Sequence, residues 1–332
     1  MQLRVLCIKN PAESILEALD RNPDGGERET TWFKTLEELT LECSPRGGLG
    51  EGVSLLKRVG NIKNLKTLDI ARTGGIPTES ELGGFIQALS NLTIERPPAK
   101  TSTTLRILHI HQGDETGFLA PGDLPTPVSK YTTTLSTLSP LLDFPNLSEL
   151  SIMVDTRFSL DDRDAWTMAR AWPKLKQLEL GYGGGGWGRE GKTFTLEGLR
   201  AFAQCCPDLE ELGVSVNIIS MESALDTQCG HQGTEGGEKT IIGSGGVDSA
   251  GVSAHRLRYL ELGNSVYTGE PERVARSLLE IFPKLCRVYG PSMAVSPEWE
   301  RKWMRVSKLV SEMQGSTSVS TLFLTPHRNQ RD

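Results

Sequence analysis

The stretch Leu175-Lys176-Gln177-Leu178-Glu179-Leu180 decides the fold, because its spacing of three leucines recurs along the whole chain. Nine copies begin at residues 3, 36, 65, 105, 147, 175, 209, 257 and 285, so successive copies start 33, 29, 40, 42, 28, 34, 48 and 28 residues apart. The last copy keeps only Leu285 and Val288. Within each full copy apolar positions alternate with mostly polar ones, which predicts a strand with one buried face.

Helical patterns follow most copies, as at residues 11–19, 160–172, 196–206 and 271–282. Asn10-Pro11, Thr195 and Ser296-Pro297 carry the residue types that begin helices. Several helices are expected to end on a large apolar residue followed by proline, which stops the helix and leads into the next strand. These ends are Phe144-Pro145, Trp172-Pro173, Cys206-Pro207 and Phe282-Pro283.

The short spacings match the period of leucine-rich repeats, and the long ones indicate repeats with insertions. A single strand–helix unit cannot bury its apolar face, whereas stacked units can. The sequence therefore predicts an α/β leucine-rich-repeat solenoid, right-handed, with a parallel sheet on its concave face and helices on its convex face.

The repeats predict one elongated domain over residues 1–313, about nine repeats long, followed by a C-terminal tail at 314–332. Gly-, Pro- and Ser-rich segments predict insertions at 113–140, with a short helix near 135–142, and at 220–254, which is expected to be flexible. Trp299, Trp303, Val306 and Val310 share one face of a final helix. That face is expected to cap the last repeat, and a partner-binding tryptophan stripe is the alternative.

Composition excludes several classes of protein. A net charge of −6 without a basic stripe argues against nucleic-acid binding. The sequence contains no apolar run of membrane-spanning length and no signal peptide pattern at its start, so no membrane partner is expected. The six cysteines have no paired framework, which favours a reduced cytoplasmic or nuclear location.

Motifs that carry chemistry are few. Residues 186–193, Gly186 to Thr193, match the phosphate loop G-x-x-x-x-G-K-[ST], with Lys192 in the lysine place. Helical patterning resumes only at about Thr195, however, so the loop amides would not lie on a helix end. A nucleotide-binding or GTPase-regulating repeat protein is therefore the alternative function. His109 and His111 share one strand face, but two ligands are too few for a metal site. We expect no enzyme activity, no cofactor and no metal.

The remaining candidate is a surface. Alternation places the second, fourth and sixth residues after each first leucine outward, on the concave side. Acidic residues predominate there, so we expect a groove that binds a protein, through a basic segment. The alternative is that the glutamates only keep an exposed strand face soluble. The residues expected to bind the partner are Glu38, Glu42, Asp69, His109, His111, Glu149, Glu179, Glu211, Tyr259 and Glu261.

Cys205-Cys206-Pro207-Asp208-Leu209-Glu210-Glu211-Leu212 resembles the cysteine-containing leucine-rich repeats of F-box proteins, which are of the ribonuclease-inhibitor-like type. Phe144-Pro145-Asn146-Leu147, Trp172-Pro173-Lys174-Leu175 and the tryptophan-bearing last helix look like the fungal members. The resemblance implies the substrate-binding arm of a ubiquitin-ligase receptor. The F-box itself is missing from this chain, so a ligase adaptor is expected as a partner only if an F-box lies upstream. A truncated, inactive paralogue is a third possibility.

Overall fold

The computed structural model describes residues 3–9, 35–43, 48–59, 62–72, 76–93, 104–112, 126–181, 192–218, 256–263, 265–290 and 297–315. Within these residues the fold is mixed α/β, with nine strands in one parallel sheet and seven α-helices. The helix expected at 11–19, the caps at Asn10 and Ser296 and the insertion at 220–254 lie outside the described residues.

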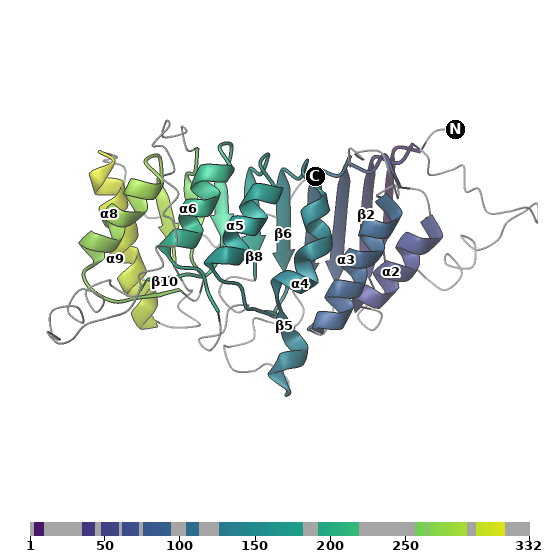
Figure 1. Ribbon diagram of the computed structural model, residues 1–332, viewed down its shortest axis with the longest axis horizontal. Helices are drawn as coiled ribbons and strands as arrows, with labels where there is room; N and C mark the ends of the chain where they lie inside the picture. The colour runs from purple at the N-terminus through teal and green to yellow at the C-terminus, as the bar shows by residue number, and fades with distance from the viewer. Residues whose placement is uncertain are drawn as a thin grey trace, which may run out of the picture.

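The nine strands stand side by side in chain order, so the colour in Figure 1 runs across the sheet from one end to the other. Every copy of the leucine pattern supplies one of them. The strands are β1 (Val5–Lys9), β2 (Glu38–Cys43), β3 (Thr67–Arg72), β4 (Ile107–Gln112), β6 (Glu149–Met153), β8 (Gln177–Leu180), β9 (Glu211–Gly213), β11 (Tyr259–Glu261) and β13 (Arg287–Tyr289).

Neighbouring strands are joined in the same register throughout. Leu68 of β3 pairs with Leu39 and with Leu108, and Leu178 of β8 pairs with Leu150 and with Leu212. Just before each strand the amide of the second residue in a copy donates to the equivalent carbonyl of the copy before it, as from Lys66 to Glu37. This bond recurs eight times, at 2.7–3.0 Å. Equivalent positions of the leucine pattern therefore lie in straight rows across the sheet.

The helices lie on one side of the sheet (Figure 1). They are α2 (Gly48–Val59), α3 (Glu79–Thr93), α4 (Leu135–Leu138), α5 (Asp162–Ala171), α6 (Leu196–Cys205), α8 (Pro271–Ile281) and α9 (Pro297–Met313), with 3-10 turns η3 (Val128–Tyr131) and η4 (Ser139–Asp143). Two small parallel pairs, β5 (Thr132–Thr133) with β7 (Arg157–Phe158) and β10 (Asn217–Ile218) with β12 (Val266–Tyr267), complete the described structure.

The sheet face toward the helices, here called the covered face, holds the core. From the second copy to the eighth, all three apolar positions are buried. Helix-end residues Phe144, Trp172, Cys206 and Phe282 are buried as expected. The Trp172 indole also donates a hydrogen bond of 2.9 Å to the Leu141 carbonyl, which satisfies its only polar group inside the core.

The expected helix boundaries are confirmed to within two residues for α5, α6 and α8. Thr195 begins α6 as predicted, because its hydroxyl accepts from the Glu197 amide at 3.1 Å. The short helix expected near 135–142 corresponds to α4 and η4. Here Thr134 and Thr137 form a capping box.

The last helix packs against the last repeat, as the capping interpretation requires. Trp303, Val306 and Val310 of α9 are buried, and Trp299 is partly buried against the same core. Gly290 lies in the ninth copy at the position that holds leucine, isoleucine or valine in the others. A Cβ there would come within 2.4 Å of the Trp303 Cβ. The tryptophan therefore fills the space that the missing side chain leaves.

Candidate functional site: the open face of the sheet

The opposite side of the sheet, here called the open face, carries the side chains between the apolar positions. Strand register arranges them in two rows. The first row holds Val5, Glu38, Thr67, Ile107, Glu149, Gln177, Glu211, Tyr259 and Arg287. The second row holds Cys7, Thr40, Asp69, His109, Ser151, Glu179, Gly213, Glu261 and Tyr289.

All ten residues expected to bind a partner belong to this face. Eight lie in the two rows, and Glu42 and His111 lie one step further along β2 and β4. Glu38 and Tyr259 are exposed, and the other eight are half-buried between their neighbours. The structure places seven of them in two groups that sequence spacing alone did not distinguish, one of four glutamates and one containing both histidines. Glu38 and Glu42 on β2 and Tyr259 on β11 lie outside both groups.

The first group is the glutamate cluster, defined as Glu149, Glu179, Glu211 and Glu261. These residues come from the consecutive strands β6, β8, β9 and β11. At the row positions of these four strands there is no lysine, arginine or histidine. With strands about 4.8 Å apart, four carboxyl groups fall within a span of about 14 Å. Such a patch concentrates negative potential.

Gly213 separates two members of the glutamate cluster. It lies in the second row between Glu179 on β8 and Glu261 on β11. A Cβ on Gly213 would be 3.3 Å from the Glu179 Cγ, so the Glu179 side chain lies against this glycine. Glu179 also accepts a hydrogen bond of 2.8 Å from the Ser151 hydroxyl. Glycine thus leaves a gap in the row, because no side chain stands between Glu179 and Glu261.

The electrostatics of this gap favour a cation. Burial, and then the charge of Glu179, raise the pKa of Glu261 to about 7. At neutral pH the Glu261 carboxyl therefore holds a proton for part of the time, because a second negative charge there is costly. A positively charged group between Glu179 and Glu261 would stabilise the ionised form of Glu261.

A basic edge borders the open face where the strands begin. The second residue of each copy lies there, and Arg4, Lys66, Arg106, Lys176 and Arg258 are exposed at this position. Glu37 binds two of them, with ion pairs of 3.3 Å to Arg4 and 2.9 Å to Lys66. The second, fourth and sixth residues after each leucine, from which the binding surface was predicted, do not include this edge. Counting the residue directly after the leucine would have found it.

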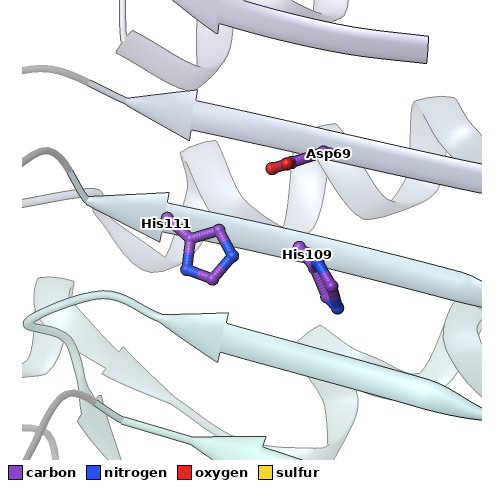
Figure 2. A group of neighbouring side chains, drawn as sticks. All are labelled: Asp69, His109 and His111. Carbon is purple, nitrogen blue, oxygen red and sulfur yellow. The ribbon is translucent and has the colours of Figure 1, made fainter. Parts of the chain in front are cut away.

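The second group of the open face comprises Asp69, His109 and His111. The two histidines lie on β4 with buried Ile110 between them, and their ring centroids are 5.4 Å apart. Asp69 pairs with His109 across the β3–β4 boundary. One nitrogen or oxygen atom from each of the three residues lies within 4.8 Å of the other two. Figure 2 shows the histidines on one strand and Asp69 on the next.

All three residues were predicted to lie on this face, but not as one set. The histidines were predicted to be a pair without a third ligand. The missed signal was available, because Asp69 and His109 each lie four residues after the first leucine of their copies, Leu65 and Leu105. Copies adjacent in the chain place such residues side by side in a parallel sheet.

The phosphate-loop match lies mostly outside the described residues, which resume at Lys192. Lys192 binds the Asp161 carboxylate at 2.8 Å, at the start of α5. Asp162 accepts from the Thr195 amide at 2.8 Å and the Gly198 amide at 3.0 Å. At the start of α6 the Thr195 and Gly198 amides therefore already have a carboxylate partner, and the Glu197 amide is bound by the Thr195 hydroxyl. The described contacts give no support to the nucleotide alternative.

Among the described residues, no helix is both long enough and apolar enough to cross a membrane. No known family model matches the sequence, and no curated protein matches it. A comparison with solved structures matches the crystal structure of the Rad7 and Elc1 complex in yeast, at 13% sequence identity and a TM-score of 0.26. The match covers 87% of this chain and 76% of that one.

Proposed function

We propose that this protein is a right-handed leucine-rich-repeat solenoid that recognises a partner protein on its open face and has no catalytic site. The chain-ordered parallel strands, the recurring backbone bond between copies and the single layer of helices support this architecture. The curved sheet of such a solenoid presents many side chains to one partner.

We infer that the partner contributes a basic segment and that the glutamate cluster binds it. The observation that carries this inference is Gly213, which places no side chain between Glu179 and Glu261, together with the raised pKa of Glu261, to which the charge of Glu179 contributes. A lysine or arginine of the partner placed there would be attracted by both carboxyl groups. An extended segment of about five residues spans the cluster.

The basic edge indicates in which orientation the partner's segment would lie on the open face. A segment with basic residues over the glutamate cluster and acidic residues near Lys176 and Arg258 would match both charge patterns. Electrostatic complementarity of this kind selects partners and sets their orientation. The resemblance to F-box proteins suggests that the bound protein is a ubiquitin-ligase substrate.

Fluorescence anisotropy with two labelled ten-residue peptides tests the proposal. One peptide is rich in lysine and arginine and the other is rich in glutamate and aspartate. We expect the basic peptide to bind at low salt, to weaken at high salt, and to lose about tenfold or more in affinity in a Glu179→Gln/Glu261→Gln variant. The matched control is Glu38→Gln/Glu42→Gln, which removes two glutamates from β2 of the same face and should leave binding unchanged. Equal binding of both peptides would refute the proposal.

A further inference from the structure

We propose that Asp69, His109 and His111 form a binding site for one divalent transition-metal ion of the zinc type. The three side chains supply two imidazole nitrogens and a carboxylate oxygen from two adjacent strands (Figure 2). The proposal is separate from the basic-segment proposal, because its three ligands lie outside the glutamate cluster and it concerns another kind of ligand. Glu149 alone takes part in both, as a member of the cluster and as a neighbour of His109.

The spacing of the three groups is close to what a metal needs. Zinc bonds to nitrogen and oxygen are about 2.0–2.2 Å long, so two ligand atoms of a tetrahedral site are about 3.3 Å apart. The three atoms here lie within 4.8 Å of one another. Rotation of the half-buried side chains would bring the atoms to bonding distance. The backbone contributes a fixed register, because Asp69 pairs with His109 on strands whose covered faces are packed.

Glu149 lies beside the first histidine. Its carboxylate lies 3.6 Å from the Nε2 atom of His109, across the boundary between β4 and β6. When His109 is neutral and Nε2 carries the proton, the Nδ1 atom is the one that can bind a metal. A carboxylate behind a ligating histidine is a common arrangement in zinc sites, where it fixes the ring and increases its basicity. Glu149 would therefore be a positioning residue for the metal rather than a ligand.

The ligand types select the ion. Imidazole suits zinc, cobalt, nickel and copper, whereas calcium and magnesium prefer sites made only of oxygen. Three protein ligands leave a coordination position for water or an incoming group. All three residues are half-buried on the open face, so this position is accessible from the side on which a partner would bind.

Isothermal titration of the full chain, treated with a chelator and then dialysed, tests the proposal with Zn²⁺ and Co²⁺ as probes. We expect one ion per chain with a Kd on the order of 1 µM. A His109→Ala/His111→Ala variant and, separately, Asp69→Asn should weaken binding about 100-fold or more. Glu149→Gln should weaken it about 10- to 100-fold. The matched control is His231→Ala/His255→Ala, which also removes two histidines and should bind as the unmodified chain does.

Spectroscopy identifies the ligands independently of affinity. Cobalt bound to nitrogen and oxygen gives visible bands without the intense near-ultraviolet band of cobalt–thiolate bonds, so the cysteines can be excluded as ligands. Circular dichroism melts verify that each variant is folded, which is expected because the substituted side chains lie outside the core. Unchanged binding by the His109→Ala/His111→Ala variant would overturn the proposal. A thiolate band, or a Kd weaker than about 1 mM in the unmodified chain, would also overturn it.

Discussion

The two faces of the sheet are made by the same strands, but they differ in how much the residue type changes from copy to copy. On the covered face, the apolar positions are filled by leucine, isoleucine or valine in nearly every copy. On the open face, the second row alone runs through cysteine, threonine, aspartate, histidine, serine, glutamate, glycine and tyrosine. Packing with the neighbouring copy restricts the covered face, whereas a half-exposed side chain is free to vary.

This difference implies that the covered face determines stability and the open face determines binding. Each buried leucine contributes to the folded state because it removes apolar surface from water, at about 25 cal/mol per Å². Side chains of the open face contribute little to stability in this way, since most of them remain partly exposed to solvent. Substitutions on the covered face should therefore unfold the protein, and substitutions on the open face should change what it binds. The predictions below test this separation, in order of expected effect.

The largest effect is expected for Leu178→Ala on the covered face of β8. Leu178 is fully buried and in register with Leu150 and Leu212, so truncation leaves a cavity between three strands. We expect a loss of about 2–5 kcal/mol in the free energy of unfolding, measured by chemical denaturation. The control is Gln177→Ala, one residue earlier on the open face, with an expected change of about 0.5 kcal/mol or less. Similar losses for both would contradict the division of roles.

The second prediction concerns the glycine that receives the capping tryptophan. In Gly290→Ala the new methyl group would meet Trp303 at 2.4–2.6 Å, so the start of α9 must move. We expect a loss of about 1–3 kcal/mol, because overpacking strains a close-packed core. Gly84→Ala is the matched control, since nothing lies within 4 Å of a Cβ there and the residue is within α3. It should gain about 0.5–1 kcal/mol from helix propensity. A gain in both variants would show that α9 does not cap the repeat as described.

The third prediction is a pH dependence that arises on the open face. The pKa of Glu261 is about 7 in the folded chain, against an ordinary value of 4.5 in an unfolded one. The folded state therefore holds a proton that the unfolded state has released, and stability falls as pH rises from about 4.5 through 7. We expect this group to account for about 1–2 kcal/mol, after allowance for solvent screening of a half-buried side chain.

Glu261→Gln isolates that contribution. The groups around Glu261 are Glu179 on β8, Glu211 on β9, and Arg287 and Tyr289 on β13. None of them is changed by the substitution. Denaturation midpoints of the two proteins should be closer at pH 5 and should diverge at pH 8, with the glutamine variant more stable. Glu38→Gln, at an exposed position of β2, should follow the unmodified chain at both pH values. Parallel curves for all three proteins would contradict the raised pKa.

The sequence predicted the covered face almost completely because one physical constraint, burial, acts on each apolar position separately. Leu68 can be assigned to the core without knowing that Leu108 is its neighbour. The open face depends on which copies are neighbours and on what their side chains do together. Asp69 lies next to His109 because β3 and β4 are paired, which the sequence of either strand alone does not show. Gly213 matters only because its neighbours in the row are Glu179 and Glu261. The contact between Gly290 and Trp303 likewise could not be predicted without knowing where the helix after the last copy packs.

The smallest effect on stability, and the most direct test of the open face, is expected for Gly213→Ala. The new Cβ would lie 3.3 Å from the Glu179 Cγ, a contact that a flexible side chain on a wet surface can relieve by rotating. We expect a change of about 0.5 kcal/mol or less in the free energy of unfolding. The same rotation moves the Glu179 carboxyl relative to Glu261, and the methyl group occupies part of the space between the two side chains. Affinity for the lysine- and arginine-rich peptide should therefore fall severalfold in the anisotropy assay, while zinc binding at Asp69, His109 and His111 stays unchanged. A stable variant with full peptide affinity would place the cation elsewhere than over Gly213, even if the glutamates still attract it.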